Sequence, residues 1–337
     1  MSRLRLAVLG TLAAGVVSAC AAILGVEDGV PRADAGVPDA APVDAPVDAP
    51  APVDARPDVL PDAAPTVCDP GKPFGAPTPL ATLNVAGVED AHGRLTPDEL
   101  TIFFSSLRSA DAGSAELFVA TRAKRTSAFG APSNLGATIN SKNADQMPSV
   151  TGDGLTLYFA TDRSFGSHIW VSTRPSVASA FAAPQVAAGL VVAAPDVDPY
   201  IAPDNASLLF ASTRQNDAGF LDLFTADAID GGFSAAVALK GVNIVGHNDA
   251  AGVMTSDKKL LYFASDRSGG KGGLDLYVAT RAAAGDAFGA PLAVAELNTP
   301  GMDVADWISA DRCRLYFSST KVANSGDYDL FVAEKTP

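Results

Sequence analysis

Acidic and basic residues recur at constant spacing from residue 90 onward in this 337-residue sequence. Each of five copies contains an Asp that is followed 18 residues later by a cation. The aspartates are Asp90, Asp145, Asp196, Asp249 and Asp303, and the cations are Arg108, Arg163, Arg214, Arg267 and Lys321. Such a repeat is most simply a network of ion pairs that satisfies buried polar groups and fixes the spacing of the repeated units. The alternative is a ring of carboxylates that binds a metal ion in a central channel.

The sequence contains no arrangement of residues that is typical of catalysis. Its three histidines, His92, His168 and His247, lie at non-equivalent positions of the copies and lack the spacing of metal ligands. No G-x-S-x-G motif and no P-loop occurs. A glycosidase needs a general acid and a base or nucleophile in different environments, whereas the recurring aspartates are equivalent. We therefore expect no catalytic residues, no metal and no cofactor.

The polar residues are embedded in a repeat of short strands. Five segments align on a turn Asp and on a Phe six residues later, and successive copies begin 51 to 55 residues apart. The aligned segments are TPDELTIFF (96–104), TGDGLTLYF (151–159), APDNASLLF (202–210), TSDKKLLYF (255–263) and SADRCRLYF (309–317). Runs such as LTLYF are short, rich in apolar and aromatic residues, and bounded by turn residues, so they indicate strands with both faces buried. The period is that of a propeller blade.

The sequence therefore predicts an all-β fold, a five-bladed β-propeller of four-stranded antiparallel blades over residues 74–337. The chain ends after the third strand of the last copy, while FGAPTPLATLN (74–84) precedes the first strand of the first copy. We expect this N-terminal segment to supply the missing fourth strand, because closing the ring removes exposed strand edges. A disulfide between Cys68 and Cys313 would tie this segment to the last blade; two unpaired thiols are the alternative.

Equivalent positions that differ between copies indicate where the fold does not dictate the residue. Two and four residues after the first Asp of each copy, the chain places His92 and Arg94, Asp198 and Tyr200, and Trp307 on strands expected to line the central channel. This mixed set of side chains is the candidate binding site. The plainer interpretation of Tyr200 and Trp307 is packing between blades.

The repeat resembles a known family. SDRSGGKGGLDLYVATR (265–281), the preceding LYFAS and their counterparts in the other copies are similar to the repeat of TolB-like, WD-repeat-like propellers. The resemblance covers nearly all of residues 74–337 and implies the fold. It says less about function, because propellers serve many roles.

The N-terminus is typical of an exported protein. Two Arg residues precede an uncharged apolar run, Leu6–Val17, which is too short to span a bilayer and predicts a signal peptide over residues 1–19. Val-Ser-Ala-Cys at 17–20 resembles the lipobox of bacterial lipoproteins, which implies lipidation at Cys20 and a membrane anchor there. Ala21 implies, by the same resemblance, the outer membrane, with the protein facing the periplasm or the exterior.

Residues 20–73 are expected to form a lipid anchor and a disordered tether. From Val26 to Lys72 the chain has ten Pro, ten acidic residues, three basic residues and no aromatic residue. The formal net charge of the whole chain is −14, and no basic patch is present, so nucleic acid is excluded as a partner. We expect a monomeric envelope protein that binds a protein or a cell-wall component without catalysis. An envelope hydrolase that cleaves a glycan or a peptide is the alternative.

Overall fold

The computed structural model describes residues 68–337, except for 110–113, 165, 216–218 and 322–326. The expected signal peptide, the lipidation site Cys20 and the tether up to residue 67 lie outside the described residues. All described residues belong to one compact unit of the chain.

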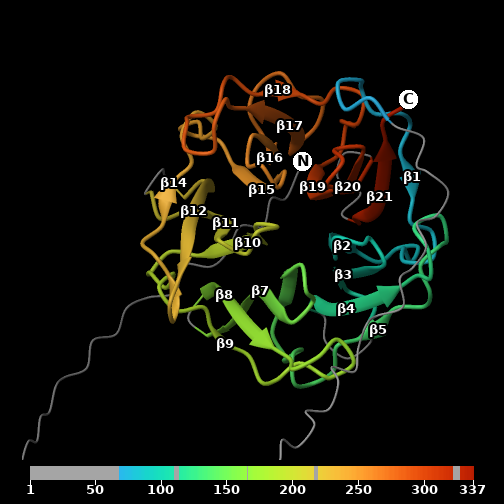
Figure 1. The fold of residues 1–337 in the computed structure, drawn as a ribbon, viewed down its shortest axis with the longest axis vertical. Helices are drawn as coiled ribbons and strands as arrows, with labels where there is room; N and C mark the ends of the chain where they lie inside the picture. The colour runs from blue at the N-terminus through green and yellow to red at the C-terminus, as the bar shows by residue number, and fades with distance from the viewer. Residues whose placement is uncertain (1–67, 110–113, 165, 216–218, 322–326) are drawn as a thin grey trace, which may run out of the picture. The chain divides into compact units, whose positions relative to one another are not determined.

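The described residues form five antiparallel sheets around a central axis, and the predicted five-bladed propeller is confirmed (Figure 1). Blade 1 consists of β2 (Asp90–Leu95), β3 (Thr101–Ser106), β4 (Glu116–Thr121) and β5 (Ser133–Asn134). Blade 2 consists of β6 (Asp145–Val150), β7 (Thr156–Ser164), β8 (Gly166–Thr173) and β9 (Gln185–Val186). Blade 3 consists of β10 (Asp196–Ile201), β11 (Ser207–Ser212), β12 (Asp222–Ile229) and β14 (Val237–Ala238), with the short β13 (Gly232–Phe233) paired to the end of β12.

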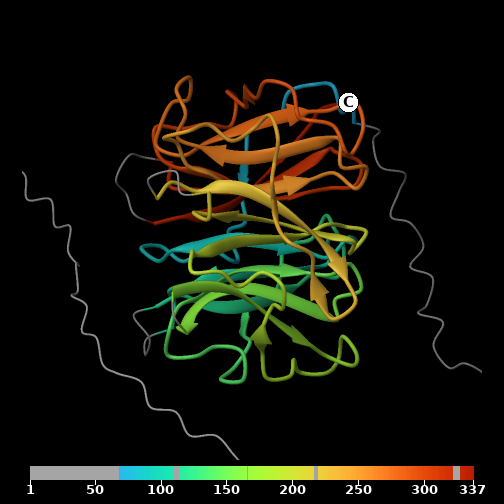
Figure 2. The same ribbon diagram turned by 90° about the vertical axis from the view of Figure 1, so that its left-hand side faces the viewer.

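Blade 4 consists of β15 (Asp249–Met254), β16 (Leu260–Ser265), β17 (Asp275–Thr280) and β18 (Leu292–Ala293). Blade 5 consists of β19 (Asp303–Ile308), β20 (Arg314–Ser319), β21 (Asp329–Glu334) and β1 (Thr78–Pro79). The first strand of each blade lies nearest the axis and the two-residue outer strand lies at the rim (Figure 1). Figure 2 shows the blades from the side, with each sheet twisted.

The second strand of each blade is buried on both faces, as the apolar runs predict. The aligned phenylalanines are at most 1% exposed in every blade, and they pack between neighbouring sheets; they are Phe104, Phe159, Phe210, Phe263 and Phe317. Burial of a side chain of this size contributes about 1.5 to 3 kcal/mol. The repeated Phe therefore holds each blade against its neighbours.

The N-terminal segment closes the ring. In β1, Thr78 pairs with Val332 and Pro79 with Phe331 of β21, so the outermost strand of blade 5 comes from the start of the propeller (Figure 1). Phe74, a few residues earlier, lies under the ammonium of Lys335 at 4.7 Å. The same contact recurs in blade 1, where Arg122 lies 4.4 Å from the ring of Phe129. Phe74 thus occupies the blade position that Phe129 occupies in blade 1.

A disulfide reinforces the closure. Cys68 and Cys313 are joined, with their Cα atoms 6.0 Å apart and 245 positions apart in sequence. By chain-entropy arguments, a bond that closes so long a loop stabilises the folded state by about 4 to 5 kcal/mol at most. It ties the segment before β1 to the turn that precedes β20.

Removal of the closing strand is therefore expected to destabilise the whole propeller. A variant that lacks residues 1–86 loses the disulfide, Phe74 and β1, and leaves the edge of β21 exposed. We expect it to aggregate, or to have a free energy of unfolding about 3 to 5 kcal/mol lower than a variant lacking only residues 1–67 with Cys313→Ser, because both lack the disulfide and only the first also loses Phe74 and β1. Urea unfolding followed by circular dichroism compares the two. Equal free energies of unfolding would show that β1 does not close the ring.

Candidate functional site

The recurring aspartates and arginines meet in four blades. Arg108 donates to Asp90 at 2.5 Å, Arg214 to Asp196 at 2.6 Å and Arg267 to Asp249 at 2.5 Å, and Arg163 pairs with Asp145. In each cluster the guanidinium also donates to a Ser or Thr hydroxyl and to a backbone carbonyl that precedes the first strand. These bonds join the first and second strands of a blade to the segment that leads in from the preceding blade. The geometry is that of a structural pin.

Blade 5 differs from the other four. No ion pair joins Lys321 to Asp303 within the part of the chain that the structure describes. Lys321 instead places its ammonium 4.1 Å from the centroid of the Phe331 ring. Asp303 accepts hydrogen bonds from the backbone and hydroxyl of Thr299, and burial raises its pKa. A Lys ammonium is a compact charge and lacks the planar set of donors with which Arg bonds the Asp, the hydroxyl and the carbonyl in the other four blades.

The variable positions of the first strands lie at bulges. His92, Met147, Asp198 and Ala251 adopt the left-handed conformation, with φ between 48° and 58°. At each position the pairing of the first and second strands shifts register. A bulge redirects side chains that a regular strand would place elsewhere. It brings the side chains of different blades together near the axis.

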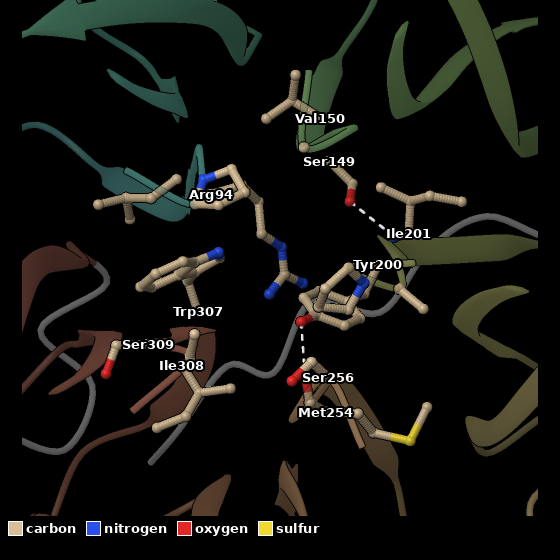
Figure 3. A pocket seen from close by; sticks show the side chains of 16 residues that line it. Arg94, Ser149, Val150, Tyr200, Ile201, Met254, Ser256, Trp307, Ile308 and Ser309 are labelled. Carbon is tan, nitrogen blue, oxygen red and sulfur yellow. Dashed lines mark hydrogen bonds between the residues drawn. The ribbon is translucent and has the colours of Figure 1, made fainter. Parts of the chain in front are cut away.

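Arg94, Tyr200 and Trp307, three of the candidate residues, meet on the axis (Figure 3). The guanidinium of Arg94 lies 5.3 Å from the centroid of the Tyr200 ring and donates to the backbone carbonyl of Asp306. The Tyr200 hydroxyl donates to the carbonyl of Met254 at 2.8 Å. These side chains fill the axis and leave a pocket of about 60 Å³, too small for an organic ligand.

His92 and Asp198, the other two candidates, also lie together. The His92 Nδ1 is 3.7 Å from an Asp198 carboxylate oxygen, and both side chains are largely buried. Burial lowers the pKa of His92. The five candidate residues thus form two neighbouring groups, Arg94 with Tyr200 and Trp307, and His92 with Asp198. The charge of Arg94 acts on both His92 and Asp198.

Asp306 is a channel residue that the sequence analysis missed. It is fully buried, and the Ser318 hydroxyl donates to its Oδ2 at 2.6 Å. Its other oxygen, the Nε of Arg94 and one oxygen of Asp198 have no hydrogen-bond partner among the described residues. Burial raises the pKa of Asp306 to about 7, against the opposing charge of Arg94. Near neutral pH, this carboxyl is poised between its two protonation states.

No three His, Cys, Asp or Glu residues converge on a metal site in the part of the chain that the structure describes. The positive charge of Arg94 interacts electrostatically with the carboxyl groups of both Asp198 and Asp306. The charges in the channel therefore compensate one another inside the protein, and Tyr200 and Trp307 pack beside them.

A second feature lies at the closure seam, the junction of blade 5 with blade 1. An open groove of about 760 Å³ runs between the outer strands of blade 5 and the loop from β4 to β5. Four of its lining residues are basic: Arg122, Arg125, Arg314 and Lys335. The disulfide also lines the groove. Unlike the channel, this groove is large enough to hold a ligand.

Glu99 organises the basic end of the seam groove. Its carboxylate is 3% exposed and accepts a bidentate interaction from Arg314, with distances of 2.6 and 2.8 Å, and a hydrogen bond from the Tyr316 hydroxyl at 3.1 Å. Arg122 and Arg125 approach the same carboxylate at 3.7 and 3.8 Å. Glu99 lies in a turn and has a φ of 60°. Its place in the sequence indicates a turn but not this role in binding three Arg residues.

The five four-stranded blades confirm the propeller fold that the resemblance to TolB-like propellers implied. The fold is that of a five-bladed β-propeller. Among solved structures, TolB from Acinetobacter baumannii matches with 13% identity and a TM-score of 0.41, over 79% of this chain and 56% of that one. This chain therefore spans little more than half the length of that TolB. Neither a protein-family model nor a curated protein matches the chain.

Two glycoside hydrolases match over nearly their full length. The α-L-arabinofuranosidase from Podospora anserina has 16% identity and a TM-score of 0.53, over 81% of this chain and 99% of its own. The catalytic domain of the α-L-arabinofuranosidase from Coprinopsis cinerea has 14% identity and a TM-score of 0.51, over 79% and 98%. At this identity the likeness shows the propeller fold alone.

The raised pKa of Asp306 predicts a pH dependence of stability. Between about pH 4 and 7 the folded state holds a proton on Asp306 that the unfolded state has released, so the free energy of unfolding falls as the pH rises through this window. Asp306→Asn is neutral at every pH. Relative to the wild type, we expect the variant to gain on the order of 2 to 4 kcal/mol between about pH 4 and 8.

Chemical denaturation of both proteins at a series of pH values measures this difference. Other buried acids with a raised pKa, such as Asp303, are present in both proteins, so their contributions to the pH dependence cancel in the comparison. A constant difference between variant and wild type across the window would contradict the assignment.

Proposed function

We propose that this chain is a membrane-tethered protein of the cell envelope whose propeller binds a protein or a cell-wall component without catalysis. The observation that carries the proposal is the contrast between the channel and the seam groove. In the channel, Arg94, Asp198 and Asp306 are at most 5% exposed. The groove is open and has the volume of a ligand site.

A binding role fits the distribution of charge. A hydrolase must bring a general acid and a base or nucleophile into contact with the scissile bond. The carboxylates of Asp198 and Asp306 are buried, and Arg94 beside them donates to the backbone carbonyl of Asp306. Binding needs only an accessible surface with fixed polar groups, and the seam groove supplies one on the strands that close the ring.

The envelope location rests on the N-terminal signal and the lipobox-like Val-Ser-Ala-Cys at 17–20, with Cys20 as anchor and the outer membrane as destination. In the described residues, no helix has the length and apolarity needed to cross a bilayer. A lipid on Cys20 would attach the chain to the membrane. On this proposal, the acidic, Pro-rich segment between the anchor and the propeller serves as a tether.

Hydrolysis of an envelope glycan or peptide is the second candidate. The specific observation in its favour is the carboxyl of Asp306, with a pKa of about 7, in the field of a second carboxyl group, that of Asp198. Paired carboxyl groups with different environments are the equipment of a general acid and its partner. This function requires the Arg94, Tyr200 and Trp307 side chains to move away from the axis.

Incubation of residues 21–337 with envelope glycans and peptides separates the two functions. We expect retention of a component in pull-down and no release of product by chromatography, because the channel acids are inaccessible. Turnover that Asp198→Asn abolishes, with the thermal melt unchanged, would establish the hydrolase instead. Leu292→Ala, at an exposed position on the rim of blade 4, is the control and leaves either activity unchanged.

A further inference from the structure

We propose that the seam groove binds an acidic peptide segment of a partner protein, through a carboxylate held by Arg125 and Arg122. This inference rests on the proposed binding function and specifies its ligand. The groove is lined by four basic residues and two acidic ones, Asp311 and Glu334, on a chain whose net charge is −14.

The charges at the basic end of the groove do not balance. Three guanidinium groups, from Arg122, Arg125 and Arg314, surround the carboxylate of Glu99. Arg314 also pairs with Asp311 at 3.0 Å. Two carboxylates thus face three guanidinium groups, and one positive charge remains for a ligand.

Arg125 is the cation with donors to spare. Its side chain is 38% exposed, and its nearest carboxylate oxygen lies 3.8 Å away, beyond hydrogen-bond distance. Arg314, by contrast, is committed to Glu99 in a bidentate pair. Arg122 spends one nitrogen on the Tyr316 hydroxyl at 2.9 Å and another on the Glu99 carbonyl. Arg122 is thereby fixed beside the exposed guanidinium of Arg125, and this pair of neighbouring donors suits capture of a planar carboxylate.

The arrangement is specific to the closure seam. Counting back from the aligned Phe of the outer segment, the counterparts of Arg125 are Val177 in blade 2 and Ala284 in blade 4. Glu99 corresponds to Gly154, Asn205, Lys258 and Arg312 at the same turn. The fold therefore does not require this charge cluster, since four blades are built without it.

The lining favours a peptide over a glycan. Pro79, Leu80 and Ala81 provide apolar wall, whereas the two aromatic rings that line the groove, Phe129 and Tyr316, are 4% and 2% exposed. Sugar rings are recognised by stacking on exposed aromatic faces, which these buried rings do not present. Small apolar side chains beside a guanidinium match a peptide that carries Asp or Glu between aliphatic residues.

Fluorescence polarisation with residues 21–337 tests the inference. The probe is a labelled synthetic peptide in which Asp alternates with Ala and Val, and its matched control carries Asn in place of Asp. We expect the Asp peptide to bind and Arg125→Ala to weaken binding about tenfold, the effect of losing a charged hydrogen-bond pair. Arg125→Lys is expected to recover only part of the affinity, because Lys cannot make the bidentate contact.

Lys124→Ala is the matched control. It removes the same charge from the same exposed loop but from a residue that does not line the groove, and we expect an effect on the order of twofold at most. Equal binding of the Asn peptide, or equal losses in Lys124→Ala and Arg125→Ala, would overturn the acidic-peptide inference. Tight, Arg125-dependent binding of polygalacturonate with no binding of the Asp peptide would also overturn it, and would leave the proposed binding function intact. Turnover of any of these probes would contradict the proposed function itself.

Discussion

The structure depends on the closing of a ring of sheets. Each blade has an outer strand of only two residues, so few backbone hydrogen bonds hold the rim, and an open ring would expose a row of unpaired groups on β21. The chain meets this constraint by bringing its N-terminal segment back to pair with the last blade. The disulfide and the Phe74–Lys335 contact hold that segment in place. The seam groove exists because the two ends of the propeller meet there.

Buried charge serves a different purpose in the two parts of the propeller. At the start of the first strands of four blades, each Asp pairs with an Arg that also bonds a hydroxyl and a backbone carbonyl, so these pairs fix blade geometry. On the axis, Arg94 is surrounded by Asp198 and Asp306 with several polar atoms left unpaired. An incompletely paired buried group costs on the order of 1 to 3 kcal/mol. Because burial raises the pKa of Asp306, the free energy of unfolding depends on pH.

The fold was predictable because the same pattern occurs in five copies, so a strand that is uncertain in one copy is supported by the equivalent segments of the others. The aligned Phe and turn Asp set the blade period, and the missing fourth strand of the last copy identified FGAPTPLATLN (74–84) as the closing segment. Asp306 escaped prediction because its counterparts are Gly93, Pro148, Pro199 and Gly252, residues that carry backbone geometry rather than chemistry. The bulge in the strand makes this position part of the channel, and only tertiary structure reveals it. Glu99 escaped for a similar reason, since a turn residue gains its role only when blade 5 closes against blade 1.

Site-specific photo-crosslinking in intact cells tests most directly whether the functional surface is the seam groove. A photoreactive amino acid is placed at Ala128 in the groove, at Ser256 at the mouth of the channel, or at Leu292 on the rim of blade 4. Adducts are then identified by mass spectrometry. The account predicts one recurrent protein adduct from position 128 that is absent from positions 256 and 292. A recurrent adduct from position 256, with none from position 128, would contradict it and move the function to the axis.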